Sequence, residues 1–142
     1  MKRYRQRKGF TLVEILVVVI IITMLATMIT PQIYSKFVKA KANLARTGIA
    51  KLENSLAEFL LDCGRFPTEG DGGLDALRVA PSDLLEVWDG PYVREHDLYD
   101  PWDNPYVYHF PATLSDGEYD IISYGADGVA GGDRENADIY NN

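Results

Sequence analysis

Residues 10–29, FTLVEILVVVIIITMLATMI, decide the architecture of this 142-residue chain. They are apolar apart from three threonines and one acid, Glu14. In a helix that rises about 1.5 Å per residue they span roughly 30 Å, which matches the hydrocarbon core of a bilayer. The stretch therefore predicts a membrane-spanning helix.

Basic residues lie immediately before this stretch, and acids dominate after it. Five of the 14 lysines and arginines occupy the first eight positions, before any acid. By the positive-inside rule this end stays in the cytoplasm, and the chain after residue 30 lies beyond the membrane. Without the first eight residues, nine basic residues face 21 acids, so the formal charge changes from −7 to −12. Such a body does not bind nucleic acid, because that requires clustered lysine and arginine against the phosphates.

The junction of the two segments reads Lys8-Gly9-Phe10-Thr11-Leu12-Val13-Glu14. A conventional secretory signal is one interpretation, but its apolar stretch is only about 7–15 residues long and precedes a small-residue cleavage site, which residues 30–34 lack. The order instead resembles the prepilin motif of type IV pilin-like proteins. The resemblance implies cleavage between Gly9 and Phe10 by a prepilin peptidase, N-methylation of Phe10, and retention of the apolar segment.

Glu14 is the residue that a plain membrane anchor explains worst. A carboxylate within a membrane span costs on the order of 2.5–3.5 kcal/mol, although a helix N-terminus moderates this cost. The pilin resemblance implies that Glu14 pairs with the freed amine of Phe10 on a neighbouring subunit. In a low dielectric this pairing would set the register of subunit addition.

The helical pattern continues beyond the apolar stretch. Apolar residues recur every three to five positions as far as Cys63, which predicts one helix over about residues 11–61. Pro31 predicts a bend or local melting near residues 27–31, or alternatively the first position of a separate helix. Gly64 is placed to cap the helix C-terminus.

The rest of the chain predicts a short helix and a small sheet. Residues 74–79 are expected to form the helix. Residues 98–108 read as a Pro/Asn turn that leads into a strand, and its antiparallel partner at 118–124 would follow across a turn at 115–117. The fold class is therefore α+β, with a long N-terminal transmembrane and assembly helix packed on a small antiparallel sheet. The expected boundaries are 1–9 for a leader peptide, 10–30 for the transmembrane helix and 31–142 for a periplasmic domain.

Several segments of the body resemble the major pseudopilin of type II secretion systems. They are GRFPT at 64–68, GPY at 90–92, DPWDNPY at 100–106 and SYGADG at 123–128. Asp103 and Tyr124 depart from the glycine and leucine that are usual in that family. The resemblance implies the main structural subunit of a homopolymeric pseudopilus that drives folded proteins across the outer membrane. It further implies minor pseudopilins and an inner-membrane assembly platform as partners, with a single-pass anchor in the inner membrane and the body in the periplasm.

Residues 125–139, near the C-terminus, are predicted to form an acidic, glycine-rich loop. Its four carboxylates repel one another, so a hard cation such as calcium would stabilise it. It does not match an EF-hand, and composition alone leaves a solvated acidic loop as the alternative. The pseudopilin resemblance implies one calcium ion there, held by Asp127, Asp138 and Asp133 with the main-chain carbonyls of Tyr124 and Val129. It leaves Glu135 open as a ligand.

No catalytic pattern is present in the sequence. The two histidines lack zinc-like spacing, and no phosphate-binding glycine motif precedes a helix. A type IV pilin or a minor pseudopilin is the alternative assembly role, although one cysteine argues against the disulfide-closed loop of surface pilins. A membrane-anchored, calcium-dependent enzyme or binding module is the alternative of a different class.

Overall fold

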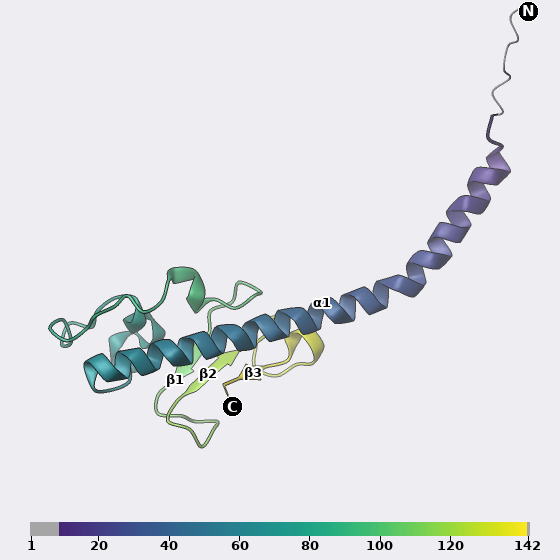
Figure 1. The fold of residues 1–142 in the computed structure, drawn as a ribbon. Helices are drawn as coiled ribbons and strands as arrows, with labels where there is room; N and C mark the ends of the chain where they lie inside the picture. Colours follow the sequence, from purple (N-terminus) through teal and green to yellow (C-terminus); the bar gives the residue numbers. More distant parts are fainter. Residues whose placement is uncertain (1–8, 142) are drawn as a thin grey trace, which may run out of the picture. The chain divides into compact units, whose positions relative to one another are not determined.

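The computed structural model describes residues 9–141 (Figure 1). The leader expected at residues 1–9 lies outside this range except for Gly9. The chain divides into two compact units, one up to Phe37 and one from Val38 onward, and each is described by itself.

One long helix, α1, runs from Leu12 to Cys63 and confirms the helix expected over residues 11–61. Its backbone stays helical through Pro31, so the expected local melting and the alternative of a separate helix are both wrong. Proline removes only its own N–H bond, and the i→i−4 bonds on either side carry the helix across that turn. The expected bend stays a prediction.

The expected cap ends α1. Gly64 has φ 75°, and its N–H donates to the Leu60 carbonyl at 2.8 Å. Glycine adopts this left-handed conformation without the steric cost that a Cβ brings. The chain leaves the helix there and turns back along it.

Four 3₁₀ helices connect the elements of the body: η1 (Glu69–Asp71), η2 (Gly73–Leu77), η3 (Glu95–Leu98) and η4 (Arg134–Asn136). The helix expected at residues 74–79 is the 3₁₀ helix η2. Arg65 fixes the first of these turns, because its guanidinium donates to both Asp71 and Asp83. This guanidinium, together with the Thr68 hydroxyl and N–H, holds the pKa of Asp71 well below its usual range.

A three-stranded antiparallel sheet has the order β1 (Val107–His109), β2 (Asp120–Ser123), β3 (Ile139–Tyr140). The pairing of β1 with β2 confirms the expected hairpin, with Val107 opposite Ile122. The tight turn expected at 115–117 is wrong, because residues 110–119 all connect the two strands. Strand β3 lies within and just beyond the predicted loop and was not expected.

Asp120 explains the long connection between β1 and β2. This carboxylate is 1% exposed and accepts hydrogen bonds from the N–H groups of Thr113, Leu114 and Ser115, and from the Ser115 hydroxyl at 2.6 Å. Burial alone would raise the pKa of Asp120, but these donors outweigh it and lower the pKa to about 2. The loop is therefore folded around one buried charge.

The core lies between α1 and the sheet in the unit that begins at Val38. Figure 1 shows the strands along the C-terminal half of α1. The helix buries one stripe against them, at spacings of three, four and seven residues. Its members are Ala45, Ile49, Leu52, Leu56 and Phe59. Tyr106 joins this core, and Trp102 and Tyr108 pack against it.

Gly48 allows α1 to approach Tyr106. The Tyr106 hydroxyl donates to the Ala45 carbonyl at 3.1 Å. A Cβ at position 48 would lie well inside van der Waals contact with that hydroxyl oxygen. The glycine thus permits the bond between the helix and the segment that leads into β1.

Replacing Gly48 by Ala is predicted to destabilise the body although alanine is the better helix former by about 1 kcal/mol. The clash with Tyr106 should outweigh that gain and cost about 1–3 kcal/mol in total. Tryptophan fluorescence during thermal melting of the full chain in detergent measures the change. Gly48→Ala should cost less in a Tyr106→Phe background, which lacks the hydroxyl oxygen. An unchanged melting temperature for Gly48→Ala alone contradicts this account of the contact.

Replacing Asp120 by Asn is predicted to lower stability at pH 7 by about 1–3 kcal/mol, since the amide turns a donor toward N–H groups that need an acceptor. The folded-state pKa lies below the ordinary value of 3.8, so the carboxylate stabilises the fold above about pH 4. That contribution is lost as pH falls toward 2. Acid unfolding should therefore be steeper in the parent than in Asp120→Asn, and equal pH profiles would count against it.

Candidate functional site

The first half of α1 exposes its apolar side chains. Phe10 is 79% exposed and Leu12 86% exposed. Within residues 9–141, α1 contains a stretch long and apolar enough to cross a membrane, and none of its 18-residue window is buried. A helix that is apolar on all sides requires lipid or other helices around it. Nothing in the described part of the chain covers this apolar surface.

Thr11 and Glu14 form a capping box at the start of this helix. The Glu14 N–H donates to the Thr11 hydroxyl at 3.2 Å, and the Thr11 N–H lies 3.5 Å from Glu14 Oε2. The box turns the Glu14 carboxylate back toward the first backbone N–H groups of the helix. No cation among residues 9–141 forms an ion pair with it. Sequence reasoning missed Thr11, although the Thr-x-x-Glu spacing was the available signal.

The C-terminal loop places its acids in different surroundings. Asp127 is exposed, and its Oδ1 accepts the Val129 N–H at 3.2 Å. Asp138 accepts the Gly131 N–H at 2.9 Å and the Tyr140 hydroxyl at 3.0 Å, both through Oδ2. Its other oxygen, Oδ1, is buried and has no hydrogen-bond partner. A buried carboxylate oxygen without a donor suits a cation.

The remaining predicted ligands do not gather as a carboxylate cluster. Asp133 is exposed and precedes η4, while Tyr124 is half-buried directly after β2 and Val129 is 62% exposed. Across residues 9–141, no three side chains of His, Cys, Asp or Glu lie together in a way that could hold a metal. An ion here would therefore depend on main-chain oxygens as well as carboxylates.

The loop backbone is tightly folded. Gly125 has φ 66°, and a Cβ there would lie 2.6 Å from the Glu135 carbonyl oxygen. The Ala126 N–H donates to the same carbonyl at 2.8 Å. Asn104 donates to the Gly125 carbonyl at 2.7 Å and so ties the loop to the turn before β1. Sequence reasoning assigned that turn to packing and missed this link.

Asp100 anchors the same turn. It is 4% exposed and accepts the N–H groups of Trp102 and Asn104. Its Oδ2 accepts the Ser123 hydroxyl at 2.6 Å, at the end of β2. One buried acid thus holds the turn against the strand from which the C-terminal loop departs.

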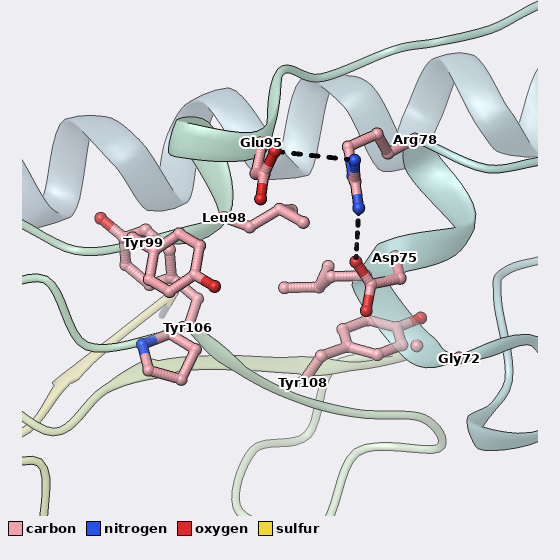
Figure 2. A pocket seen from close by; sticks show the side chains of 11 residues that line it. Gly72, Asp75, Arg78, Glu95, Leu98, Tyr99, Tyr106 and Tyr108 are labelled. Carbon is pink, nitrogen blue, oxygen red and sulfur yellow. Dashed lines mark ion pairs between the residues drawn. The ribbon is translucent and has the colours of Figure 1, made fainter.

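A pocket of about 260 Å³ lies between η2, η3 and the start of β1 (Figure 2). Arg78 lies between Glu95 at 3.8 Å and Asp75 at 4.0 Å, and its Nε is buried without a hydrogen-bond partner. These ion pairs are longer than hydrogen bonds. Tyr106 also lines the pocket, but burial raises its pKa to about 12 and its hydroxyl is bonded to α1.

Two acids, one arginine and three tyrosines supply the polar side chains of this pocket. No serine, cysteine, histidine or lysine lines it. A nucleophile next to a base, or two acids with separated pKa values, is the usual arrangement in hydrolytic and transfer enzymes. The pocket is a charged recess on the surface.

The comparisons with known proteins agree on one family. The family described as type II secretion system protein G matches residues 32–142, and the prokaryotic N-terminal methylation motif matches residues 4–30. The type II secretion system core protein G of Vibrio cholerae is 38% identical and covers 99% of this chain and 95% of its own length. The core protein G of Pseudomonas aeruginosa is also 38% identical, over 96% of each chain.

A solved structure is similar as well. The major pseudopilin from the type 2 secretion system of enterohaemorrhagic Escherichia coli aligns with a TM-score of 0.56 and 34% identity. The alignment covers 72% of this chain and 87% of that one. The helix and small antiparallel sheet described above are thus the fold of a pseudopilin.

Proposed function

The chain belongs to the type II secretion system protein G family, and we propose how it acts there as the main structural subunit of the pseudopilus. The observation that carries the proposal is the exposed apolar helix with Glu14 near its start. Lipid covers this helix before assembly, and other copies cover it afterwards. Repeated addition of copies then drives folded proteins across the outer membrane.

Processing creates the group that Glu14 lacks. Cleavage between Gly9 and Phe10 leaves a free amine on Phe10, four residues before Glu14. N-methylation preserves its positive charge, since an amine remains basic after one methyl is added. The Thr11 capping box already directs the carboxylate toward this end of the helix.

The amine of Phe10 on one copy then pairs with Glu14 of its neighbour. An unpaired carboxylate in the membrane costs on the order of 2.5–3.5 kcal/mol, so an incoming copy gains by finding the amine. The attraction is strong in the low dielectric of lipid and packed helices. It acts at one axial offset only, and this fixes the register of each added copy.

The location and partners follow from the same arrangement. The basic start of the chain stays in the cytoplasm, one span crosses the inner membrane, and residues 31–142 lie in the periplasm. The partners are other copies, minor pseudopilins, the prepilin peptidase and methyltransferase, and an inner-membrane assembly platform driven by a cytoplasmic ATPase. The match of the N-terminal methylation motif to residues 4–30 supports the processing step.

Calcium is the cofactor that we propose for the C-terminal loop. Asp138 would bind it through the buried Oδ1 that lacks a hydrogen-bond donor, and Asp127 would add a second carboxylate. Asp133 and the carbonyls of Tyr124 and Val129 would complete the oxygen ligands. The ion would supply charge neutralisation and hold the loop, because binding only to the folded state stabilises that state.

The role is structural rather than enzymatic. The family is that of a secretion-system subunit, and no serine, cysteine, histidine or lysine lines the charged pocket. A type IV pilin or minor pseudopilin uses the same N-terminal device, so the assignment to the main subunit depends on the match over residues 32–142. A membrane-anchored enzyme or binding module would not require Glu14 to assemble.

Replacing Glu14 by Ala is predicted to abolish filament formation and secretion while leaving membrane insertion intact. Removing the carboxylate eases insertion and deletes the partner of the Phe10 amine. Electron microscopy of filaments after overexpression of the full chain measures assembly. Glu69→Ala removes an exposed acid from η1 and is the matched control, which should assemble like the parent. Normal filaments from Glu14→Ala contradict the proposal.

Calcium is predicted to raise the melting temperature of the full chain in detergent, and a chelator should reverse this. At a hundredfold excess over Kd the gain is about 2.7 kcal/mol. Asp138→Asn and Asp127→Ala should each weaken or remove the response. Asp116→Ala, which removes an exposed acid from the loop before β2, should respond like the parent. A parent chain indifferent to calcium and chelator means that the loop holds no ion.

A further inference from the structure

Charge is segregated along the chain beyond the first eight residues. Residues 15–52 contain five basic residues and no acid. Residues 53–141 contain four basic residues and 20 acids. The basic residues of α1 thus lie between Lys36 and Lys51, and the chain from residue 53 onward is strongly negative.

Three exposed basic side chains on α1, Lys36, Lys39 and Arg46, form no ion pair within residues 9–141, and the last two lie in the unit that begins at Val38. Lys39 and Arg46 are seven residues apart, which places them within about 20° of each other around the helix. Neither forms an ion pair within residues 9–141, whereas Lys51 pairs with Asp97 at 2.6 Å and Lys41 lies 5.6 Å from the Trp102 ring centre. We call Lys39 and Arg46 the basic face.

A recess of about 320 Å³ lies near the C-terminal end of the same helix. We call it the acidic groove, and it is lined by Glu58, Leu61, Asp62, Asp89, Pro91 and Tyr92. None of its three acids has an ion-pair partner in the described part of the chain. The Tyr92 hydroxyl donates to Asp62 at 2.8 Å and so fixes that carboxylate.

The acidic groove also has an apolar side. Leu61 is 83% exposed although it lies on a helix that buries its other face. Long basic side chains place their methylene stems on such apolar surface while the charged end meets an acid. The groove therefore fits lysine or arginine better than it fits a small inorganic cation.

The two surfaces cannot meet within one chain. Along the helix they are separated by 12 to 23 residues, or roughly 18–35 Å. Arg46 and Glu58 also differ by about 120° around the helix axis, so they point toward different neighbours. Two complementary surfaces at different places on one molecule form a head-to-tail interface, which builds an open filament when successive copies are also displaced along one axis.

We infer that the acidic groove of one copy receives the basic face of a second copy that lies farther from the membrane. The inference rests on the proposed assembly of parallel copies, each offset along the axis from the next. A copy displaced outward by a total of roughly 18–35 Å brings Lys39 and Arg46 level with the groove of a copy behind it.

Each such contact is weak, because exposed ion pairs contribute about 0.2–1 kcal/mol. The contact contributes specificity, since an arrangement of copies that places like charges together costs several kcal/mol. The Phe10–Glu14 pair fixes the step between neighbours in the membrane. The basic face and the acidic groove favour parallel copies separated by this axial offset in the periplasm.

Charge reversal in the full chain tests the inference. Arg46→Glu alone and Glu58→Arg alone should each reduce the number of filaments about tenfold, and the double variant should restore most of them. Glu118→Arg makes the same substitution at an exposed glutamate on the loop before β2, and it should assemble like the parent. Filaments are counted by electron microscopy, and thermal melting of each variant verifies its fold.

A second measurement covers a variant that fails to fold. Assembly of the parent should weaken as salt rises from about 0.05 to 0.5 M, because exposed charges are screened over that range. Single variants that assemble normally, or a well-folded double variant that stays as poor as the singles, overturn the inference and leave the proposed function intact. A parent that forms no filaments at all overturns both.

Discussion

The apolar half of α1 is the constraint on which the rest of the molecule depends. Its side chains are exposed, and no part of the described chain covers its membrane-length window. Such a surface is stable only in lipid or against other helices. Every copy therefore requires lipid or other helices around this surface, and Glu14 is the one acid in the apolar half.

The body is built to hold the other end of the same helix. Gly48 lets Tyr106 reach the α1 backbone, and the core stripe of α1 packs on β2. Two buried acids then organise the loops: Asp120 folds the connection before β2, and Asp100 holds the turn that contacts the C-terminal loop. The sheet is small, so these buried charges supply order that packing alone does not. Assembly thus depends on the exposed apolar surface of α1, while the hydrogen bonds of Asp100 and Asp120 stabilise the loops of the body.

Sequence periodicity predicted the helix and the pairing of β1 with β2, because apolar residues recur at regular spacing in both. It failed where one side chain reorganises a segment. Asp120 draws three N–H groups onto itself, so a three-residue turn became a ten-residue connection. Strand β3 was missed because a two-residue strand after a glycine-rich loop has no period to detect. The assignment of the loop acids as calcium ligands stays a prediction, and sequence cannot reveal that Asp138 keeps a buried oxygen without a donor.

The most direct test of the central claim is a distance between copies at the N-terminus. Filaments are grown from a mixture of copies labelled with ¹⁵N and copies labelled with ¹³C, and solid-state NMR then detects only contacts between different copies. The account predicts a signal that joins the Phe10 amine nitrogen to the Glu14 carboxyl carbon. Well-formed filaments that lack this signal would contradict it.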